Sequence, residues 1–194
     1  MIFRRNSEMA KVITGRRTRL SYANVWSPKA GPNGGKEAYS CVLLIPKDDK
    51  KTVEAIKSAI KEAYEEGKSK LKGSGKTVPP LASIRTPLRD GDAERPEQPE
   101  FADHYFVSAK SYVAPGIVDL DRKEILDHSE VYSGVYARAS VNFYAYNTNG
   151  NKGIACGLNH LQKIRDGEPF GGRGRAEDDF ANLDDEDEED DLLG

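Results

Sequence analysis

The pattern of hydrophobic and polar positions is most regular between residues 135 and 146, where the two kinds alternate. The odd positions are all apolar: Val135, Ala137, Ala139, Val141, Phe143 and Ala145. The even positions are polar or aromatic: Tyr136, Arg138, Ser140, Asn142, Tyr144 and Tyr146. Because neighbouring side chains of a strand point to opposite faces, this period of two predicts a strand whose odd face lies in the core.

Runs of apolar, aromatic and β-branched residues predict the strands, which we place at residues 11–25, 37–45, 103–113, 132–147 and 151–158. The run at 37–45 is apolar on successive positions, which is typical of a strand buried on both faces. The segment Asn147–Asn151 predicts a hairpin between the last two strands, because Asn and Gly tolerate positive φ angles. A short helical turn is expected at residues 159–165.

The period changes to three and four residues after Asp48 and Asp49, either of which can cap a helix. The apolar positions of this helix are Val53, Ile56, Ile60, Ala63, Tyr64 and Leu71. They form one face, and Gly67 is expected to end or fray the helix. Residues 27–36 and 73–102 are rich in Gly, Pro and charge, which predicts loops.

Together these elements predict a mainly β domain at residues 9–168. We expect an OB-fold-like, partly open antiparallel barrel with one inserted α-helix. A flexible Gly/Arg linker is expected at residues 169–176, and a disordered acidic C-terminal tail at residues 177–194.

Charge divides the chain into two parts that the net charge of −3 conceals. Residues 176–194 contain eleven acidic residues and no basic one, whereas the rest of the chain carries 29 basic and 21 acidic groups, a net charge of +8. A tethered polyanion reaches a millimolar effective concentration, so the tail is expected to compete with nucleic acid for a basic groove. The alternative is a solubilising appendage. Four apolar residues of the tail are candidate docking points for protein partners: Phe180, Leu183, Leu192 and Leu193.

The even face of residues 135–146 suggests a binding chemistry, because an ordinary solvated strand would carry Lys, Glu and Thr there. Tyrosines stack on bases and cations pair with phosphates, which predicts a site for single-stranded nucleic acid. The candidate stacking residues are Tyr136, Tyr144 and Tyr146, with Tyr22, Trp26, Phe106 and Tyr112 as further platforms. The candidate polar contacts are Arg19, Lys110, Arg138 and Asn142. The alternative is that the tyrosines pack under the helix or the long loop.

Catalytic and metal-binding patterns are missing from the sequence, so we expect neither an enzyme nor a cofactor. Gly75-Lys76-Thr77 resembles the end of a phosphate-binding loop, but Lys70 stands where its first glycine is required. The three histidines have no partner at metal-ligand spacing. Cys41 and Cys156 lie in apolar stretches, which predicts buried free thiols in a reducing compartment. Without a secretory signal or a run of transmembrane length, a soluble cytoplasmic protein is expected.

Six short segments carry a resemblance to a known family: residues 19–24 (RLSYAN), 44–48 (LIPKD), 107–111 (VSAKS), 132–134 (YSG), 141–146 (VNFYAY) and 150–154 (GNKGI). With these segments in this order, the chain resembles the bacteriophage single-stranded DNA-binding proteins, which were first catalogued as a phage family of unknown function. The resemblance implies an OB fold and sequence-independent binding of single-stranded DNA. It also implies a role in phage DNA replication, recombination or repair, in the host cytoplasm. Many such tails end in an aromatic residue, whereas this one ends Leu-Leu-Gly.

Three other functions stay open at this point. An RNA-binding or RNA-chaperone protein would use the same stacking chemistry, since an aromatic ring does not inspect the 2′-hydroxyl. A non-catalytic interaction module would use the Tyr/Arg face for a protein partner, because both residue types are enriched at interfaces. A nuclease would require Mg²⁺, for which the sequence offers no preorganised site. Replication or recombination proteins are candidate partners of the tail, and the protein is expected to be a monomer or a dimer.

Overall fold

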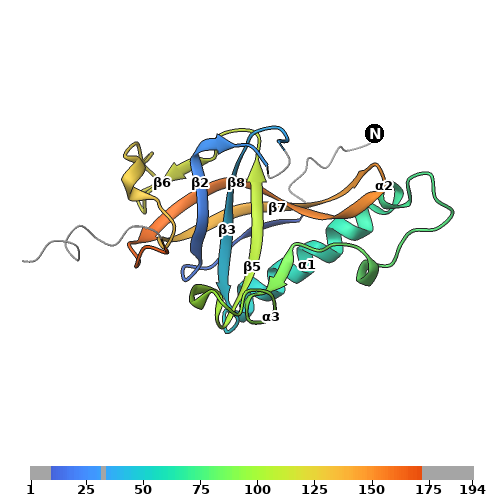
Figure 1. Ribbon diagram of the computed structural model, residues 1–194, viewed down its shortest axis with the longest axis horizontal. Helices are drawn as coiled ribbons and strands as arrows, with labels where there is room; N and C mark the ends of the chain where they lie inside the picture. Colours follow the sequence, from blue (N-terminus) through green and yellow to red (C-terminus); the bar gives the residue numbers. More distant parts are fainter. Residues whose placement is uncertain (1–9, 32–33, 172–194) are drawn as a thin grey trace, which may run out of the picture.

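Five strands of the computed structural model, which describes residues 10–31 and 34–171, curl into a barrel (Figure 1). In spatial order they are β7 (Tyr136–Thr148), β2 (Arg19–Lys29), β3 (Ala38–Pro46), β5 (His104–Ser111) and β8 (Asn151–Arg165). The pairing of β7 with β8 returns the order to its start. The contact between β2 and β7 is a single pair, Arg19 with Tyr136, so the barrel is only partly closed there. The predicted mainly β fold is confirmed.

Two of the pairings are parallel, which the prediction of an antiparallel barrel did not include. Strand β8 runs parallel to β5, with Ala109 opposite Cys156, and parallel to the short β6 (Gly116–Val118) on its other side. The remaining pairings between named strands of the described residues are antiparallel.

The single strand predicted at residues 11–25 is wrong, because the chain bends after β1 (Lys11–Ile13) and resumes as β2. Both pieces lie along β7, where Val12 pairs with Val141. The bend passes close to the start of the helix: a Cβ added at Gly15 would fall 2.2 Å from Asp49 Oδ2. Only glycine fits this approach, so the bend is tied to the helix terminus.

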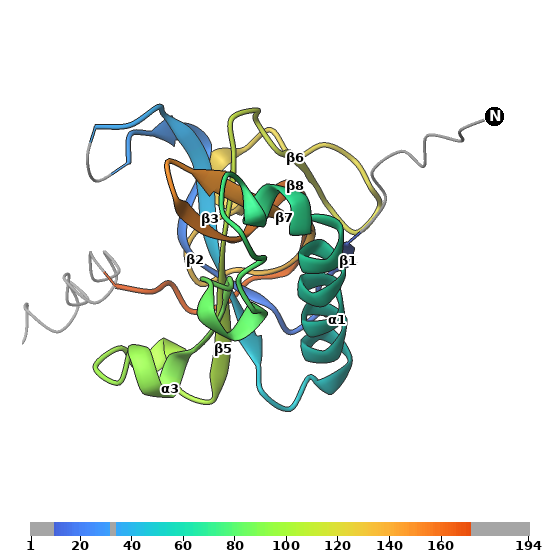
Figure 2. The ribbon, with the colours of Figure 1, turned by 90° about the vertical axis from the view of Figure 1, so that its right-hand side faces the viewer.

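The predicted helix is α1 (Lys50–Glu66), and it begins and ends as expected. The Asp49 carboxylate caps it by accepting hydrogen bonds from Thr52 N (3.2 Å) and Thr52 Oγ1 (2.7 Å), and Gly67 separates it from α2 (Lys68–Lys72). Its apolar face covers one side of the barrel. Figure 2 shows α1 on the opposite side of the barrel from α3 (Gly91–Glu94).

Residues 73–102, which were expected to be a loop, contain four short elements. They are η1 (Leu81–Ser83), β4 (Leu88–Asp90), α3 and η2 (Pro99–Phe101). Strand β4 pairs with β5, and Lys47 at the end of β3 lies 2.7 Å from the carboxylates of both Asp90 and Asp92. These contacts hold the insertion against the outer side of β3 and β5.

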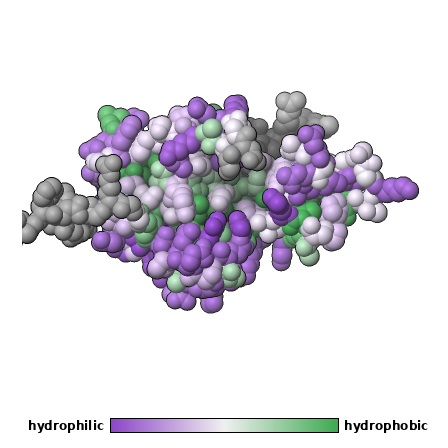
Figure 3. Space-filling view, in the orientation of Figure 1, coloured by the Kyte–Doolittle hydropathy of each residue, from purple (hydrophilic) through white to green (hydrophobic). Residues whose placement is uncertain are grey.

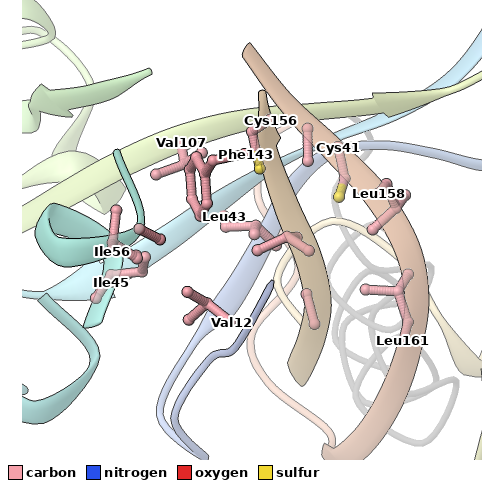
Figure 4. Close-up of a cluster of buried hydrophobic side chains, with 14 of the residues drawn as sticks. Val12, Cys41, Leu43, Ile45, Ile56, Val107, Phe143, Cys156, Leu158 and Leu161 are labelled. Carbon is pink, nitrogen blue, oxygen red and sulfur yellow. The ribbon is translucent and has the colours of Figure 1, made fainter. Parts of the chain in front are cut away.

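The barrel interior is a continuous hydrophobic core, and all six odd positions between 135 and 145 are buried in it, as predicted. Figure 4 shows side chains from β1, β3, β5, β7, β8 and α1 meeting there, including Cys41 and Cys156, which are buried free thiols. A second, smaller cluster lies outside the barrel and consists of Leu44, Phe101 and Phe106, with Val42 and Phe170 packed against it.

The hairpin between β7 and β8 is confirmed, and its turn residues Asn149 (φ 52°) and Gly150 (φ 84°) both have positive φ angles. The helical turn predicted at residues 159–165 is wrong, because β8 continues to Arg165. Near α2 the two strands extend to one end of the molecule (Figure 1).

Candidate nucleic-acid interface

The outward positions of neighbouring strands form rows across the barrel. Strand pairing aligns Ser40 of β3 with Lys110 of β5, then Lys110 with Gly157 of β8, and Gly157 with Asn142 of β7. The Asn142 side chain lies over Gly157, since a Cβ added there would fall 2.8 Å from Asn142 Oδ1. Within this row small residues therefore flank Lys110, so no bulky side chain rises from the surface directly beside it.

Two exposed tyrosines lie beside this row. Tyr112 is 54% exposed and Tyr144 is 40% exposed. The ammonium groups of Lys36 and Lys110 lie 4.5 and 5.6 Å from the centroid of the Tyr112 ring. Burial raises the pKa of the Tyr144 hydroxyl, which Lys110 partly offsets, so the phenol is neutral at physiological pH.

Tyr146 is the next outward position of β7 after Tyr144, and it is half-buried. A Cβ added at Gly153 would fall 2.7 Å from Tyr146 Oη and 2.7 Å from the Arg85 carbonyl oxygen. The phenol therefore lies over bare backbone, next to the chain at Arg85. We call the surface formed by Lys36, Lys110, Tyr112, Tyr144 and Tyr146 the tyrosine face.

The outer side of β3 and β5 is seen in Figure 3, where a pale band of less hydrophilic residues crosses the middle between hydrophilic regions above and below. Ser40 and Val42 of β3 and Ser108 of β5 are outward positions of these strands. A floor of small side chains beside exposed tyrosines and lysines suits a polynucleotide, because bases stack on the aromatic rings while phosphates pair with the cations.

Arg19 and Tyr136, both predicted contacts, are engaged within the protein. The Arg19 guanidinium donates hydrogen bonds to the carbonyl oxygens of Gly134 (3.0 Å) and Glu168 (2.8 Å), and it lies 4.2 Å from the centroid of the Phe170 ring. The Tyr136 ring has Arg19 at 4.8 Å and Arg165 at 3.7 Å from its centroid. Arg19 thus fixes residues 166–170, which we call the strap, to the barrel.

The strap crosses the outer surface beside the second hydrophobic cluster. Tyr132 Oη donates to the Gly167 carbonyl (2.9 Å), and Phe170 N donates to the Ser133 carbonyl (3.0 Å). Although Phe170 falls at the start of the predicted linker, its ring packs against the second cluster. The described chain ends one residue later.

A cavity of about 520 Å³ adjoins Tyr136 at one end of the barrel. Its lining includes the basic residues Arg17, Arg19, Lys47 and Arg165. Arg17 is paired with Asp48 (3.0 Å), which lowers the pKa of that carboxyl, whereas Arg165 has no ion-pair partner among the described residues. Because its guanidinium lies on the Tyr136 ring and not against a carboxylate, Arg165 is a candidate phosphate contact.

The other predicted residues have different surroundings. Phe106 is a correction: it is 2% exposed, because Phe101 packs edge-on against its ring, so it cannot stack on a base. Trp26 stacks on His128 at 4.3 Å and donates from Nε1 to the Val131 carbonyl. Tyr22 is 55% exposed.

Arg138 is part-buried, and its Nε donates to Gln162 Oε1 (2.9 Å). The apolar tail residues Phe180, Leu183, Leu192 and Leu193 lie outside the described residues, as does the predicted tail as a whole. Sequence reasoning missed Lys36 and Arg165. Nothing in their local sequence marks them, because each becomes notable only through the tyrosine that folding places beside it.

Among residues 10–31 and 34–171, no group of three or more His, Cys, Asp or Glu residues is arranged to hold a metal ion. No helix in the described part of the chain has the length and apolarity needed to cross a membrane.

Comparison with known proteins gives concordant matches. The family model described as "Enterobacter phage Enc34, ssDNA-binding protein" matches residues 10–193. Protein p50 of Acyrthosiphon pisum secondary endosymbiont phage 1 is 31% identical over 165 residues, covering 81% of this chain and 85% of that protein.

Two solved structures are also similar. The single-stranded DNA-binding protein from bacteriophage Enc34 in complex with ssDNA is 28% identical with a TM-score of 0.68, over 84% of this chain and 91% of that one. The single-stranded DNA-binding protein gp2.5 of bacteriophage T7 shares the fold at 17% identity, with a TM-score of 0.59 over 89% and 95% of the two chains.

Proposed function

Because the chain belongs to the family of the Enterobacter phage Enc34 single-stranded DNA-binding protein, we propose that it binds single-stranded DNA without sequence preference on its tyrosine face. It is a binding protein and not an enzyme. The observation that carries the proposal is the exposure of Tyr112 and Tyr144 beside lysine ammonium groups. Every base has a face that can stack on a phenol, and every phosphate can pair with an ammonium group.

We assign the tyrosines and the cations different roles in binding. Tyr112, Tyr144 and Tyr146 stack bases, while Lys36 and Lys110 meet the phosphates between them. Tyr22 is a further platform at the far side of the floor formed by Ser40 and Ser108. Arg165, whose guanidinium is free of carboxylates, is a phosphate contact at the end of the barrel.

Titration with oligo-dT tests this proposal, using Y112A/Y144A against the matched Y112F/Y144F. Stacking of a base on an aromatic residue contributes about 1–3 kcal/mol, so the alanine variant is expected to lose affinity by roughly tenfold or more while the phenylalanine variant keeps it. Binding that prefers duplex DNA, or that does not weaken as salt rises, would contradict the proposal. A matched RNA oligonucleotide determines whether the protein prefers DNA.

The acidic tail is proposed to compete with DNA for this surface and to recruit replication or recombination proteins in the host cytoplasm. The net charge of +8 on the rest of the chain supports competition. The described chain ends directly after the strap, which Arg19 holds against the barrel.

Deletion of residues 176–194 tests the competition. The truncated protein is expected to bind oligo-dT more tightly at low salt, and the gain is expected to shrink as salt rises because both contacts are screened. Unchanged affinity at both salt concentrations would eliminate competition by the tail and leave the tyrosine face in place.

A further inference from the structure

The segment from residue 67 to residue 89 has an unusual charge. It contains six basic residues, Lys68, Lys70, Lys72, Lys76, Arg85 and Arg89, and no acidic one. Two of these are engaged: Lys68 pairs with Glu65, and Arg89 pairs with Glu94. Lys70, Lys72, Lys76 and Arg85 are exposed and have no ion-pair partner in the described part of the chain.

This basic segment is fixed to the end of the β7–β8 hairpin by hydrogen bonds to its backbone. Asn147 Nδ2 donates to the Lys70 carbonyl (3.0 Å), and the Ile154 N–H donates to the Arg85 carbonyl (2.8 Å). Gly67 packs against β7, since a Cβ there would fall 2.2 Å from Ala145 Cβ. We call residues 67–87 and the hairpin end at residues 146–153 the arm.

The arm is continuous with the tyrosine face. Arg85 forms a bridge with Gly153, and Gly153 pairs with Tyr146. Cations of the arm therefore begin next to the last tyrosine of the face. In Figure 1 α2 and the hairpin end lie together at one end of the molecule, where Figure 3 shows hydrophilic residues mixed with pale and hydrophobic ones.

We propose that the arm is a second part of the DNA site, which takes the phosphates of the strand beyond the nucleotides stacked on the tyrosine face. This inference rests on the proposed function. The arm offers cations, and its one aromatic residue is the half-buried Tyr146, so it holds the sugar–phosphate chain and not the bases. A short oligonucleotide contacts only the tyrosine face, whereas a longer strand also reaches the arm.

Affinity as a function of oligonucleotide length tests the inference with K70Q/K72Q/K76Q. These side chains are exposed, and the contacts that fix the segment use its backbone, so the variant is expected to fold normally. The matched control is K50Q/K51Q/K61Q, which removes three exposed lysines from α1 on the opposite side of the barrel from α3. The site of one OB fold takes about 4–16 nucleotides, so oligo-dT of about 6 nucleotides lies near the lower end of this range and oligo-dT of about 20 lies above it.

The arm variant is expected to bind the short oligonucleotide like the wild type and the long one more weakly. Each phosphate contact on a single strand contributes about 0.7 to the salt slope, so loss of three contacts makes the slope shallower by about 2. The same relation lowers affinity for the long strand roughly 10- to 100-fold near 0.1 M salt.

Three results would overturn the proposed role of the arm. They are an equal loss of affinity for both lengths, no loss of affinity for either length, and the same loss of affinity in the α1 control. None of these results would contradict DNA binding by the tyrosine face, because that proposal is tested separately by the affinity of Y112A/Y144A for the short oligonucleotide. Failure of the wild type to bind oligo-dT of either length would instead remove the proposed function itself.

Discussion

At the scale of single residues, Tyr136 and Tyr144 occupy equivalent outward positions of β7 and differ in what surrounds them. Arg19 and Arg165 lie within 5 Å of the Tyr136 ring centroid, whereas Tyr144 is 40% exposed beside Lys110. The alternation in the sequence predicts which way each side chain points. It does not predict whether a distant segment covers the ring, because that depends on contacts far apart in the chain.

Arg19 and Arg165 are expected to have separable roles. R19M removes two hydrogen bonds to carbonyl oxygens, each worth about 1–3 kcal/mol for a charged donor, so the Tm is expected to fall by several degrees. The salt slope for oligo-dT is expected to stay as in the wild type. R165M is expected to do the reverse, with Tm nearly unchanged and a slope shallower by about 0.7. A shallower slope for R19M would show that Arg19 contacts phosphate.

The two cysteines are expected to be unreactive in the folded protein. Burial raises the pKa of the Cys41 thiol to about 12 and raises that of Cys156 as well. Because the thiolate is the reactive form, a thiol reagent at pH 8 is expected to label neither cysteine until the protein is unfolded, and then to label both. Fast labelling of one thiol under native conditions would mean that the barrel opens locally.

At the scale of elements, β8 shows how a strand can imitate a helix in the sequence. Leu158 and Leu161 are both buried although they are three residues apart. The pairing with β7 passes from Val141–Leu158 to Ser140–His160, so Asn159 is the extra residue of a β-bulge. The bulge shifts the alternation by one position, so Leu161 is buried and the strand continues where a helical turn was predicted.

Elements whose stabilising contacts are local were predictable. The capping residue Asp49 and the regular apolar face of α1 lie within one stretch of sequence, as do the alternation of β7 and the turn at Asn149 and Gly150. The insertion between α2 and β5 was not predictable, because it is held by distant groups. Lys47 holds β4 and α3, and Phe101 packs on the far side of β5.

The contact between Lys47 and the insertion is expected to depend on pH. Lys47 lowers the pKa of both Asp90 and Asp92, so the folded protein keeps these carboxylates ionised more readily than the unfolded chain does. Their stabilisation is therefore fully present above the ordinary carboxyl pKa of 3.8 and is lost as the pH falls through the lowered values.

Thermal unfolding of K47Q measures this effect. The variant is expected to melt about 1–3 °C below the wild type at pH 7, as for an exposed ion pair, and the difference is expected to shrink below about pH 3.5. K51Q, on the exposed side of α1, is the matched control. A difference that persists at low pH would mean that Lys47 stabilises the protein through packing on Tyr105, whose ring centroid lies 5.2 Å away.

At the scale of the whole molecule, the separation of charge is the dominant feature. The positive part of the chain contains both the tyrosine face and the arm, and the acidic residues 176–194 follow it in the sequence. Competition by such a tail requires that it contact the same cations as the DNA. A tail that contacts the arm should then be energetically coupled to it, whereas deletion of a tail that only improves solubility would leave the affinity unchanged.

A double-mutant cycle on the binding of a long oligo-dT measures this coupling, using the wild type, the deletion of residues 176–194, K70Q/K72Q/K76Q, and the two changes combined. If the tail occupies the arm, the deletion is expected to raise affinity less when the arm lysines are absent, because the tail then has fewer cations to cover. The coupling is expected to vanish near 1 M salt, where the Debye length is about 3 Å. An equal gain in both backgrounds would place the tail on the tyrosine face alone, since only contacts that the arm variant lacks can make the two changes interact.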